Sequence, residues 1–173
     1  MDFDALIAIA RTQHQQPDVF INIPKEWSQG RTVFGGLSAA MLYSAAREYI
    51  EEDRPLRSMT TNFVGPLLFD IPFQINVEMV REGKNVSQLL ARIIQDGKNC
   101  VLTQFCFAKA RQSKTAVTNN DQHNMPIPKK AKFIPNIPKV TPRFLRHYEL
   151  SINDGGLPFT GKKEHPLLRL DAF

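Results

Sequence analysis

The chain has 173 residues, enough for one domain of ordinary size or for one domain and part of another. Hydrophobic residues make up 42% of it and charged residues 23%, a globular composition. No apolar stretch approaches the roughly 20 residues that span a bilayer, so we predict a protein that does not cross a membrane.

The formal charge of +5 is unevenly distributed. Residues 1–111 carry 12 basic and 12 acidic side chains, whereas residues 112–173 carry 10 basic and 5 acidic ones. A basic run of this kind can contact an anion or nucleic acid, but it is more often simply solvated. We therefore predict that the protein has no nucleic-acid partner. The basic residues of this run are Lys129, Lys130, Lys132, Lys139, Arg143 and Arg146.

The chain opens with "MDFDALIAIARTQ", in which acids come first and a basic residue follows only at Arg11. A secretory signal begins in the opposite way, with basic residues. We read the segment as a short amphipathic helix of a cytoplasmic protein.

The next elements are a predicted strand, "DVFINIP", and a predicted helix over residues 36–52 that Gly35 and Gly36 introduce. Apolar and small residues from Leu37 to Ala46 cover every side of this helix. A helix that is apolar all round is enclosed by other structure, so we expect this one to be wrapped.

Four β-rich segments follow: "LRSMTTNFVGPLL", "IPFQINVEMVREG", "NVSQLLARIIQDG" and "NCVLTQFCFAKAR". The second alternates apolar and polar residues with period 2, as expected for a sheet with one covered side. The turns "REGKN" and "QDGKN" predict antiparallel hairpins. The sequence therefore predicts an α+β domain over residues 1–111 in which an antiparallel sheet curls around one long helix.

Beyond Arg111 the composition changes. Five prolines between residues 126 and 142 predict a linker over residues 112–142. Residues 143–173 again contain a strand, a glycine turn and a strand, in "FLRHYELSIND", "GGLPFTGKKEHP" and "LLRLDAF", and we read them as the beginning of a second, incomplete unit.

Several motifs resemble the medium-chain-type acyl-CoA thioesterases, a family with a double hotdog fold. The matching motifs are "WxxGRxxFGG" at residues 27–36, "NFVGPL" at 62–67, "VREGKNVS" at 80–87 and "QDG" at 95–97. The resemblance covers the first hotdog repeat and the entry to the second. It implies an acyl-CoA substrate, a hydrolase of fatty acid metabolism, and no cofactor or metal.

The resemblance also implies that the thioester lies near the start of the helix, with the acyl chain between helix and sheet. A helix N-terminus offers unpaired N–H groups and a positive dipole end, so Gly36 N–H is our candidate donor to the thioester oxygen. The structural alternative is that Gly35 and Gly36 only permit a sharp turn and close packing. Substrate contacts are expected from Phe34, Gly35, Thr61, Asn62, Phe63, Arg81 and Lys84.

Arg81 and Lys84 bracket a turn and have the charge to hold the phosphates of coenzyme A, although exposed turn cations are commonplace. "TTNF" would line the acyl channel, but it is also an ordinary strand sequence.

No general base can be assigned. Tyr43 stands where many hotdog thioesterases carry an acid, and Glu48 follows Gly36 by about 18 Å along the helix at 1.5 Å per residue. In the double-hotdog family the catalytic Asp, Thr or Ser, and Gln belong to the second repeat, at positions that would lie past Phe173. The chain is then either shortened or a reduced member of the family, and alone it need not be active.

Two functions therefore stay open: an acyl-CoA thioesterase, and a non-catalytic acyl-CoA-binding hotdog module. A single hotdog unit exposes a sheet edge, so we also expect pairing with another unit, as a homodimer when the second repeat is cut short.

Overall fold

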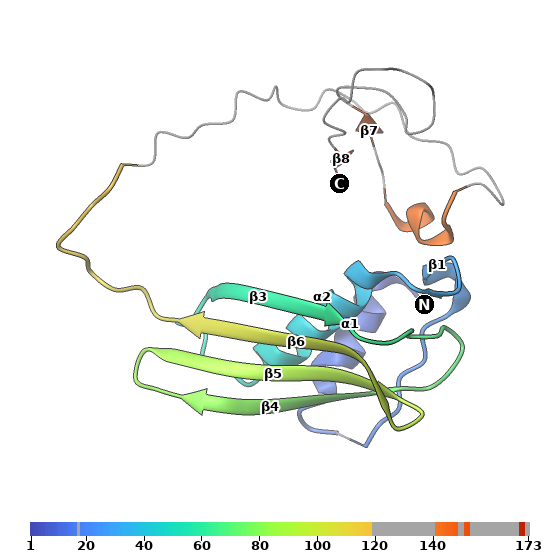
Figure 1. The fold of residues 1–173 in the computed structure, drawn as a ribbon, viewed down its shortest axis with the longest axis horizontal. Coiled ribbons are helices and arrows are strands. Elements are labelled where there is room, and N and C mark those ends of the chain that lie inside the picture. The colour runs from blue at the N-terminus through green and yellow to red at the C-terminus, as the bar shows by residue number, and fades with distance from the viewer. Residues whose placement is uncertain (17, 119–140, 149–150, 153–169, 172–173) are drawn as a thin grey trace. The chain divides into compact units, whose positions relative to one another are not determined.

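The computed structural model describes residues 1–16, 18–118, 141–148, 151–152 and 170–171 (Figure 1). The chain divides into two compact units, Met1–Gln112 and Ser113–Phe173. In the described residues, no helix is long and apolar enough to cross a membrane.

The first unit begins with the predicted amphipathic helix, α1, over Phe3–Thr12. Asp2 caps it, because its carboxylate accepts a hydrogen bond of 2.9 Å from the Ala5 N–H. Leu6 and Ala10 are fully buried on the face that packs against the rest of the unit.

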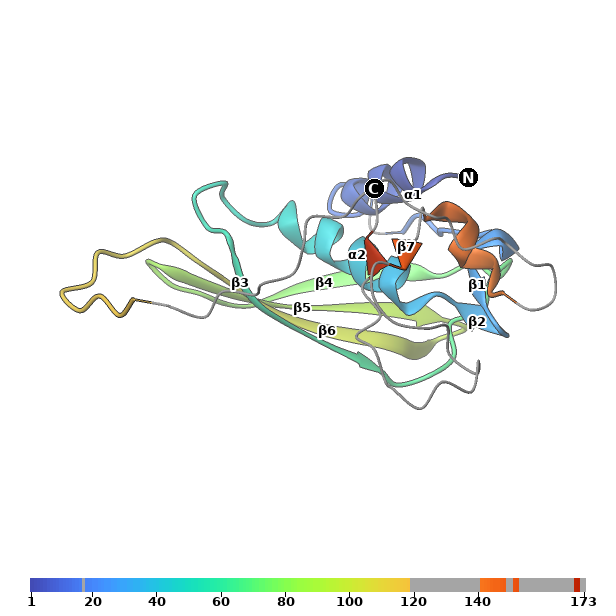
Figure 2. The same ribbon diagram turned by 90° about the horizontal axis from the view of Figure 1, so that it is seen from above.

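Helix α2 spans Gly35–Arg47 and lies between α1 and the sheet, so that the unit has three layers (Figure 2). Between Leu37 and Arg47 every residue is buried or half-buried, which confirms the prediction of an enclosed helix. The helix ends five residues before the predicted boundary. Glu48 and the acids that follow it are unfavourable at the C-terminal end of a helix, because that end of the dipole is also negative. The Arg47 side chain donates hydrogen bonds to the carbonyls of Ile50 and Glu51, just past the helix end, at 2.6 and 3.2 Å.

The sheet consists of β3 (Leu56–Phe63), β4 (Gln74–Glu82), β5 (Val86–Gln95) and β6 (Lys98–Ala108). Its order is β3-β6-β5-β4, and all neighbours are antiparallel. The two predicted hairpins, β4–β5 and β5–β6, are confirmed. The sheet turns its buried face, which carries Ile75, Leu89, Ala91, Ile93, Phe105 and Phe107, to α2.

The predicted strand over residues 18–24 is not formed. Only one bridge is present, between Ile21 and Phe73, whose backbones exchange hydrogen bonds of 2.8 and 2.9 Å. Pro24 has no N–H to extend the ladder, and the chain turns into a short 3-10 helix, Lys25–Trp27. A tight hairpin of β1 (Ser28–Gln29) and β2 (Thr32–Val33) then leads into α2.

In the second unit, a 3-10 helix covers Arg143–His147, and β7 (Ser151–Ile152) pairs antiparallel with β8 (Leu170–Asp171). The prediction that "FLRH", residues 144–147, begins a strand is therefore wrong. Pro142 begins a turn in which its carbonyl accepts from Leu145 N–H at 3.2 Å, and the Phe144 and Tyr148 rings stack edge to face. The predicted linker falls largely on residues 119–140, which lie outside the described residues.

Candidate functional site

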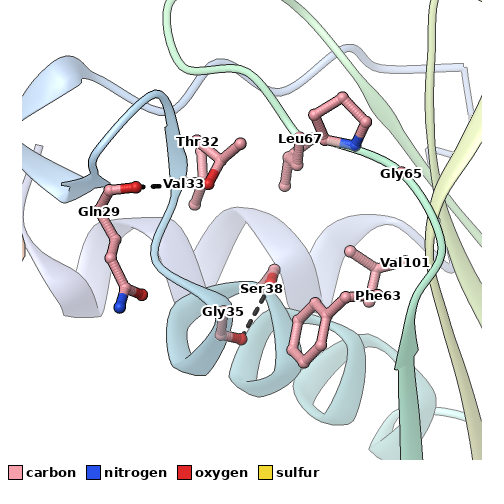
Figure 3. Close-up of a pocket in the computed structure, with 10 residues that line it drawn as sticks. Gln29, Thr32, Val33, Gly35, Ser38, Phe63, Gly65, Leu67 and Val101 are labelled. Atoms are coloured by element: carbon pink, nitrogen blue, oxygen red, sulfur yellow. Dashed lines mark hydrogen bonds between the residues drawn. The ribbon is translucent and has the colours of Figure 1, made fainter.

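A pocket of about 250 Å³ opens at the N-terminal end of α2 (Figure 3). It is bounded by the β1–β2 hairpin, the first turn of the helix, the end of β3 and the loop after β3. Its lining residues are Gln29, Thr32, Val33, Gly35, Ser38, Phe63, Gly65, Pro66, Leu67 and Val101.

The helix start supplies free backbone donors at this pocket. Phe34 is the N-cap residue, and its carbonyl accepts from the N–H groups of Leu37 and Ser38 at 3.1 and 3.3 Å. In the part of the chain that the structure describes, the N–H groups of Gly35 and Gly36 have no acceptor. Two unpaired N–H groups at the positive end of a 13-residue helix can stabilise a negative charge.

The glycine pair also makes room for two aromatic rings. A Cβ on Gly35 would lie 2.9 Å from Phe63 Cζ, and a Cβ on Gly36 would lie 2.5 Å from the Phe34 ring. The glycines therefore do permit close packing of the two rings. Close packing does not exclude a role in holding the thioester oxygen, because the N–H groups of Gly35 and Gly36 stay unpaired among the described residues.

Backbone and side-chain hydrogen bonds hold the pocket walls in place. Val33 N–H donates to Leu67 O at 2.9 Å and so joins β2 to the loop after β3. The buried Gln95 amide accepts from Leu68 N–H at 2.8 Å and donates to the carbonyls of Leu68 and Ile71 at 3.0 and 2.9 Å. Three bonds from one side chain fix this loop against the end of β5.

The polar side chains of the lining are amide and hydroxyl groups. Ser38 Oγ donates to Gly35 O at 2.9 Å, and Thr32 Oγ1 donates to Gln29 O at 3.4 Å (Figure 3). None of the described residues that line the pocket is acidic, and no group of three His, Cys, Asp or Glu side chains in the described ranges could hold a metal. The pocket can bind and polarise a carbonyl, but these side chains do not include a strong base.

The positions considered for a general base lie away from the pocket. The Tyr43 ring packs against the rings of Phe105 and Phe107, with both centroid distances 6.3 Å. Glu48 follows the last residue of α2 and forms an ion pair of 3.7 Å with Arg11.

The structure brings together only part of the predicted site. Gly35 and Phe63 line the pocket, and Gly36 and Phe34 adjoin it without being lining residues. Thr61 and Asn62 lie on β3 but do not line it. Thr61 accepts a hydrogen bond of 3.1 Å from Thr103 Oγ1.

Arg81 and Lys84 lie at the opposite end of the sheet. The β4–β5 turn is level with the start of β3, because Val86 pairs with Ala108 and Leu56 pairs with Phe107 on the same strand β6. From Leu56 to Phe63 the strand runs about 23 Å at 3.3 Å per residue. Arg81 and Lys84 therefore do not line the pocket at the glycine pair, and their role in holding the phosphates of coenzyme A stays a prediction.

Other lining residues were not predicted as a site: Gln29, Thr32, Val33, Ser38, Gly65, Pro66, Leu67 and Val101. A signal for several of them was present, since "WxxGRxxFGG" and "NFVGPL" contain them between the residues that were singled out. The two motifs are in fact the two walls of one pocket.

An antiparallel sheet wrapped on a central helix whose glycine-led start opens into a pocket defines the hotdog class. A solved protein of unknown function with this fold, from Alicyclobacillus acidocaldarius, superposes with a TM-score of 0.62 at 20% identity, covering 76% of this chain and 48% of that one. This likeness confirms the predicted α+β hotdog fold.

Residues 23–108 match the family model described as the acyl-CoA thioesterase N-terminal domain. Acyl-CoA thioesterase 2 of Haemophilus influenzae is 42% identical over 65 residues, which is 38% of this chain and 23% of that protein. The chain belongs to the acyl-CoA thioesterase family through this domain. The matched segments span less than half the length of either relative.

Proposed function

We propose that the chain supplies the first hotdog unit of an acyl-CoA thioesterase, which hydrolyses fatty acyl-CoA to free fatty acid and coenzyme A. The observation that carries the proposal is the pocket at the start of α2, with the unpaired N–H groups of Gly35 and Gly36 beside it. Membership of the thioesterase family supports the same reaction.

In this reaction, water attacks the thioester carbonyl, the carbon–sulfur bond breaks, and the coenzyme leaves as the thiol. Negative charge develops on the carbonyl oxygen during the attack, where a helix N-terminus favours it. We assign this oxygen to Gly36 N–H, with Gly35 N–H as the neighbouring donor. The acyl chain then enters the apolar side of the pocket, lined by Val33, Leu67 and Val101.

The alternative is a non-catalytic module that binds acyl-CoA. It is favoured by the lining itself, which among the described residues contains amides and hydroxyls but no carboxylate to activate water. Such a module would hold the thioester in the same place and leave the chemistry to a second unit.

We also propose that the unit pairs through β3. In the described sheet β3 is an edge strand, hydrogen-bonded to β6 alone, and its end exposes Phe63 (61%) and Val64 (54%). An unpaired edge with exposed apolar side chains is a template for another strand. A second copy of this chain, or a second repeat, would continue the sheet and cover the open side of the pocket.

The two functions are separated by measuring release of free thiol and calorimetric binding on the same samples of medium- and long-chain acyl-CoA. Thiol release supports the thioesterase, and binding without release at any acyl length supports the module. Absence of both would reject the proposal as a whole. The variant Gly35→Ala tests whether the signal comes from this pocket. The added methyl group narrows the pocket, so it should weaken acyl-CoA binding and, where hydrolysis is found, thiol release.

A further inference from the structure

A second pocket, of about 360 Å³, lies at the tip of the β4–β5 hairpin, far from the glycine pair. Three of its seven lining residues are cationic and, within the described residues, none is acidic. The lining residues are Arg81, Gly83, Lys84, Asn85, Val86, Gln88 and Arg111.

A β-bulge directs Arg81 into this pocket. The register between β4 and β5 shifts after Met79, which pairs with Leu89, so that Arg81 pairs with Gln88. Side chains of paired residues lie on one face of a sheet, and Leu89 lies on the buried face toward α2. In an unshifted ladder Arg81 would pair with Ser87 and would lie on the same face as Met79, toward α2. Because the register shifts, Arg81 lies beside Gln88 on the outer face, which is an accepted use of a bulge.

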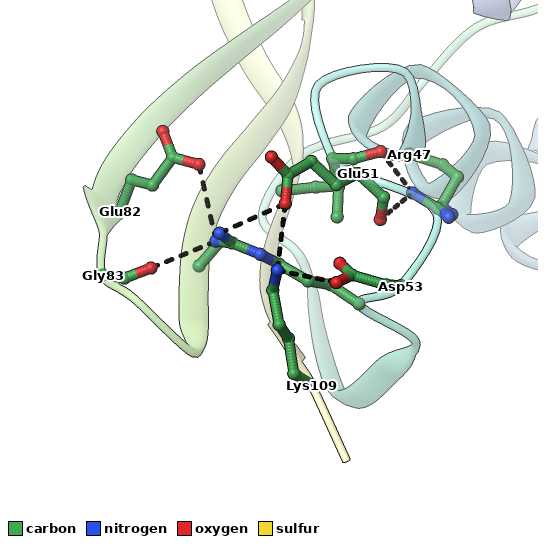
Figure 4. A network of polar contacts seen from close by, with 9 residues as sticks. Arg47, Glu51, Asp53, Glu82, Gly83 and Lys109 are labelled. Carbon is green, nitrogen blue, oxygen red and sulfur yellow. Dashed lines mark hydrogen bonds and ion pairs between the residues drawn. The ribbon is translucent and has the colours of Figure 1, made fainter. Parts of the chain in front are cut away.

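Three acids at this end of the unit are paired with other cations (Figure 4). Glu51 pairs with Arg54 and Lys109 at 3.5 and 3.3 Å, Asp53 pairs with Lys109 at 2.6 Å, and Glu82 pairs with Arg54 at 3.4 Å. In the part of the chain that the structure describes, Arg81, Lys84 and Arg111 form no ion pair. Three like charges are thus gathered in one hollow without a counterion from these strands.

Gathering such charges costs free energy, because like charges repel and each must be held near the others. An anion in the hollow removes that cost. The two guanidinium groups offer planar pairs of donors that match phosphate oxygens, and Lys84 adds a point charge. Asn85 and Gln88 carry amide donors for a ligand's polar groups, and the half-exposed Val86 gives an apolar surface.

We propose that the pocket formed by Arg81, Lys84 and Arg111 binds the phosphate groups of a small polyphosphorylated anion. Its distance of about 23 Å from Phe63 along the sheet makes it a site separate from the thioester pocket of the same unit. The anion has two sources: the 3′-phosphorylated nucleotide end of a coenzyme A, or a free polyphosphate. This inference does not depend on thioester hydrolysis.

The test is isothermal titration of the full chain with inorganic pyrophosphate and with adenosine 3′,5′-bisphosphate, neither of which carries an acyl chain. Substitutions in this pocket separate binding here from anion binding at the start of α2. We expect saturable binding that weakens as salt is raised. Each of the substitutions Arg81→Gln, Lys84→Gln and Arg111→Gln should weaken it at least about tenfold, as expected for loss of a charged hydrogen bond. Preference for the bisphosphate supports the coenzyme source, and equal binding of pyrophosphate supports the free polyphosphate.

The matched control is Lys98→Gln, which removes an exposed cation from the other hairpin, β5–β6, and should leave binding within twofold. Melting curves of all variants should be alike, because the substituted side chains are exposed. Absence of binding to both probes would overturn the proposal. So would binding that persists in a variant combining Arg81→Gln, Lys84→Gln and Arg111→Gln, or binding that Lys98→Gln weakens as much as these substitutions do. A thiol-release result of either sign leaves this outcome unaffected.

Discussion

The Phe63 ring lies over the first turn of α2 so closely that a methyl group on Gly35 would come within 2.9 Å of Cζ. Phe63 comes from the sheet edge and Gly35 from the helix start, so this contact closes one side of the pocket. Because the Phe63 side chain is exposed, its ring can move away when the space is needed.

Gly35→Ala should therefore weaken acyl-CoA binding about tenfold with little loss of stability. Alanine is up to about 1 kcal/mol better than glycine in a helix, and displacement of an exposed ring offsets part of that gain. We expect the free energy of unfolding, from urea titration, to stay within about 1 kcal/mol of the original. Binding is measured by calorimetry.

The matched control is the double variant Gly35→Ala/Phe63→Ala, in which the added methyl group no longer meets a ring. A double-mutant cycle should show strong coupling between the two positions, with binding partly restored. Additive losses would mean that Phe63 and Gly35 do not shape the pocket together.

Gln95→Leu should loosen the loop after β3 and destabilise the unit by about 1–3 kcal/mol. The substitution leaves the half-buried backbone groups of Leu68 and Ile71 without the three hydrogen bonds that the amide now makes. Hydrogen exchange should accelerate at Leu67 and Leu68 before it does at the strands of the sheet. Unchanged exchange in the loop would contradict this role for Gln95.

Arg54→Met should cost about 2–3 kcal/mol of unfolding free energy. Arg54 is only 6% exposed and donates to Ser87 Oγ, Gly83 O and Glu82, in addition to its ion pair with Glu51. The matched control is Arg57→Met, since Arg57 is exposed and makes one bond of 3.1 Å, to Ala108 O. The control should change the free energy of unfolding by less than about 0.5 kcal/mol. Equal losses for the two variants would contradict the claim that the buried Arg54 stabilises the unit more than the exposed Arg57 does.

Light scattering should find a dimer that the double substitution Ser58→Lys/Asn62→Lys converts to monomer. Lysines on a strand edge disfavour its pairing with another strand, and both positions are exposed on β3. Val80→Lys, on the opposite edge strand β4, is the control and should leave the dimer intact. A monomeric original protein would exclude pairing of two copies through β3.

The elements with a strong local pattern were predictable from the sequence. The enclosed helix and the β4–β5–β6 meander follow from periodicity and turn residues, which act over a few positions. The position of β3 beside β6 rather than beside β4 does not, because it depends on a long-range pairing. The predicted strand over residues 18–24 failed because alternation was present but its ladder partner was not, and Pro24 ended it.

Most of the pocket was not predictable in this way. Leu67 reaches the pocket because Val33 binds its carbonyl and Gln95 fixes its neighbour Leu68, contacts that join residues 27 or more positions apart. The direction of Arg81 depends on a one-residue bulge that the alternation of "INVEMVRE" does not reveal. Such features arise from tertiary pairing rather than from local preference.

The central claim, that a fatty thioester binds at the start of α2, is tested most directly by amide NMR during titration with a non-hydrolysable acyl-CoA thioether. The account predicts saturable shifts that are largest at the Gly35 and Gly36 amides, with Phe63 and Leu67 also affected. Saturable binding that leaves Gly35 and Gly36 unmoved, or no binding at all, would contradict it.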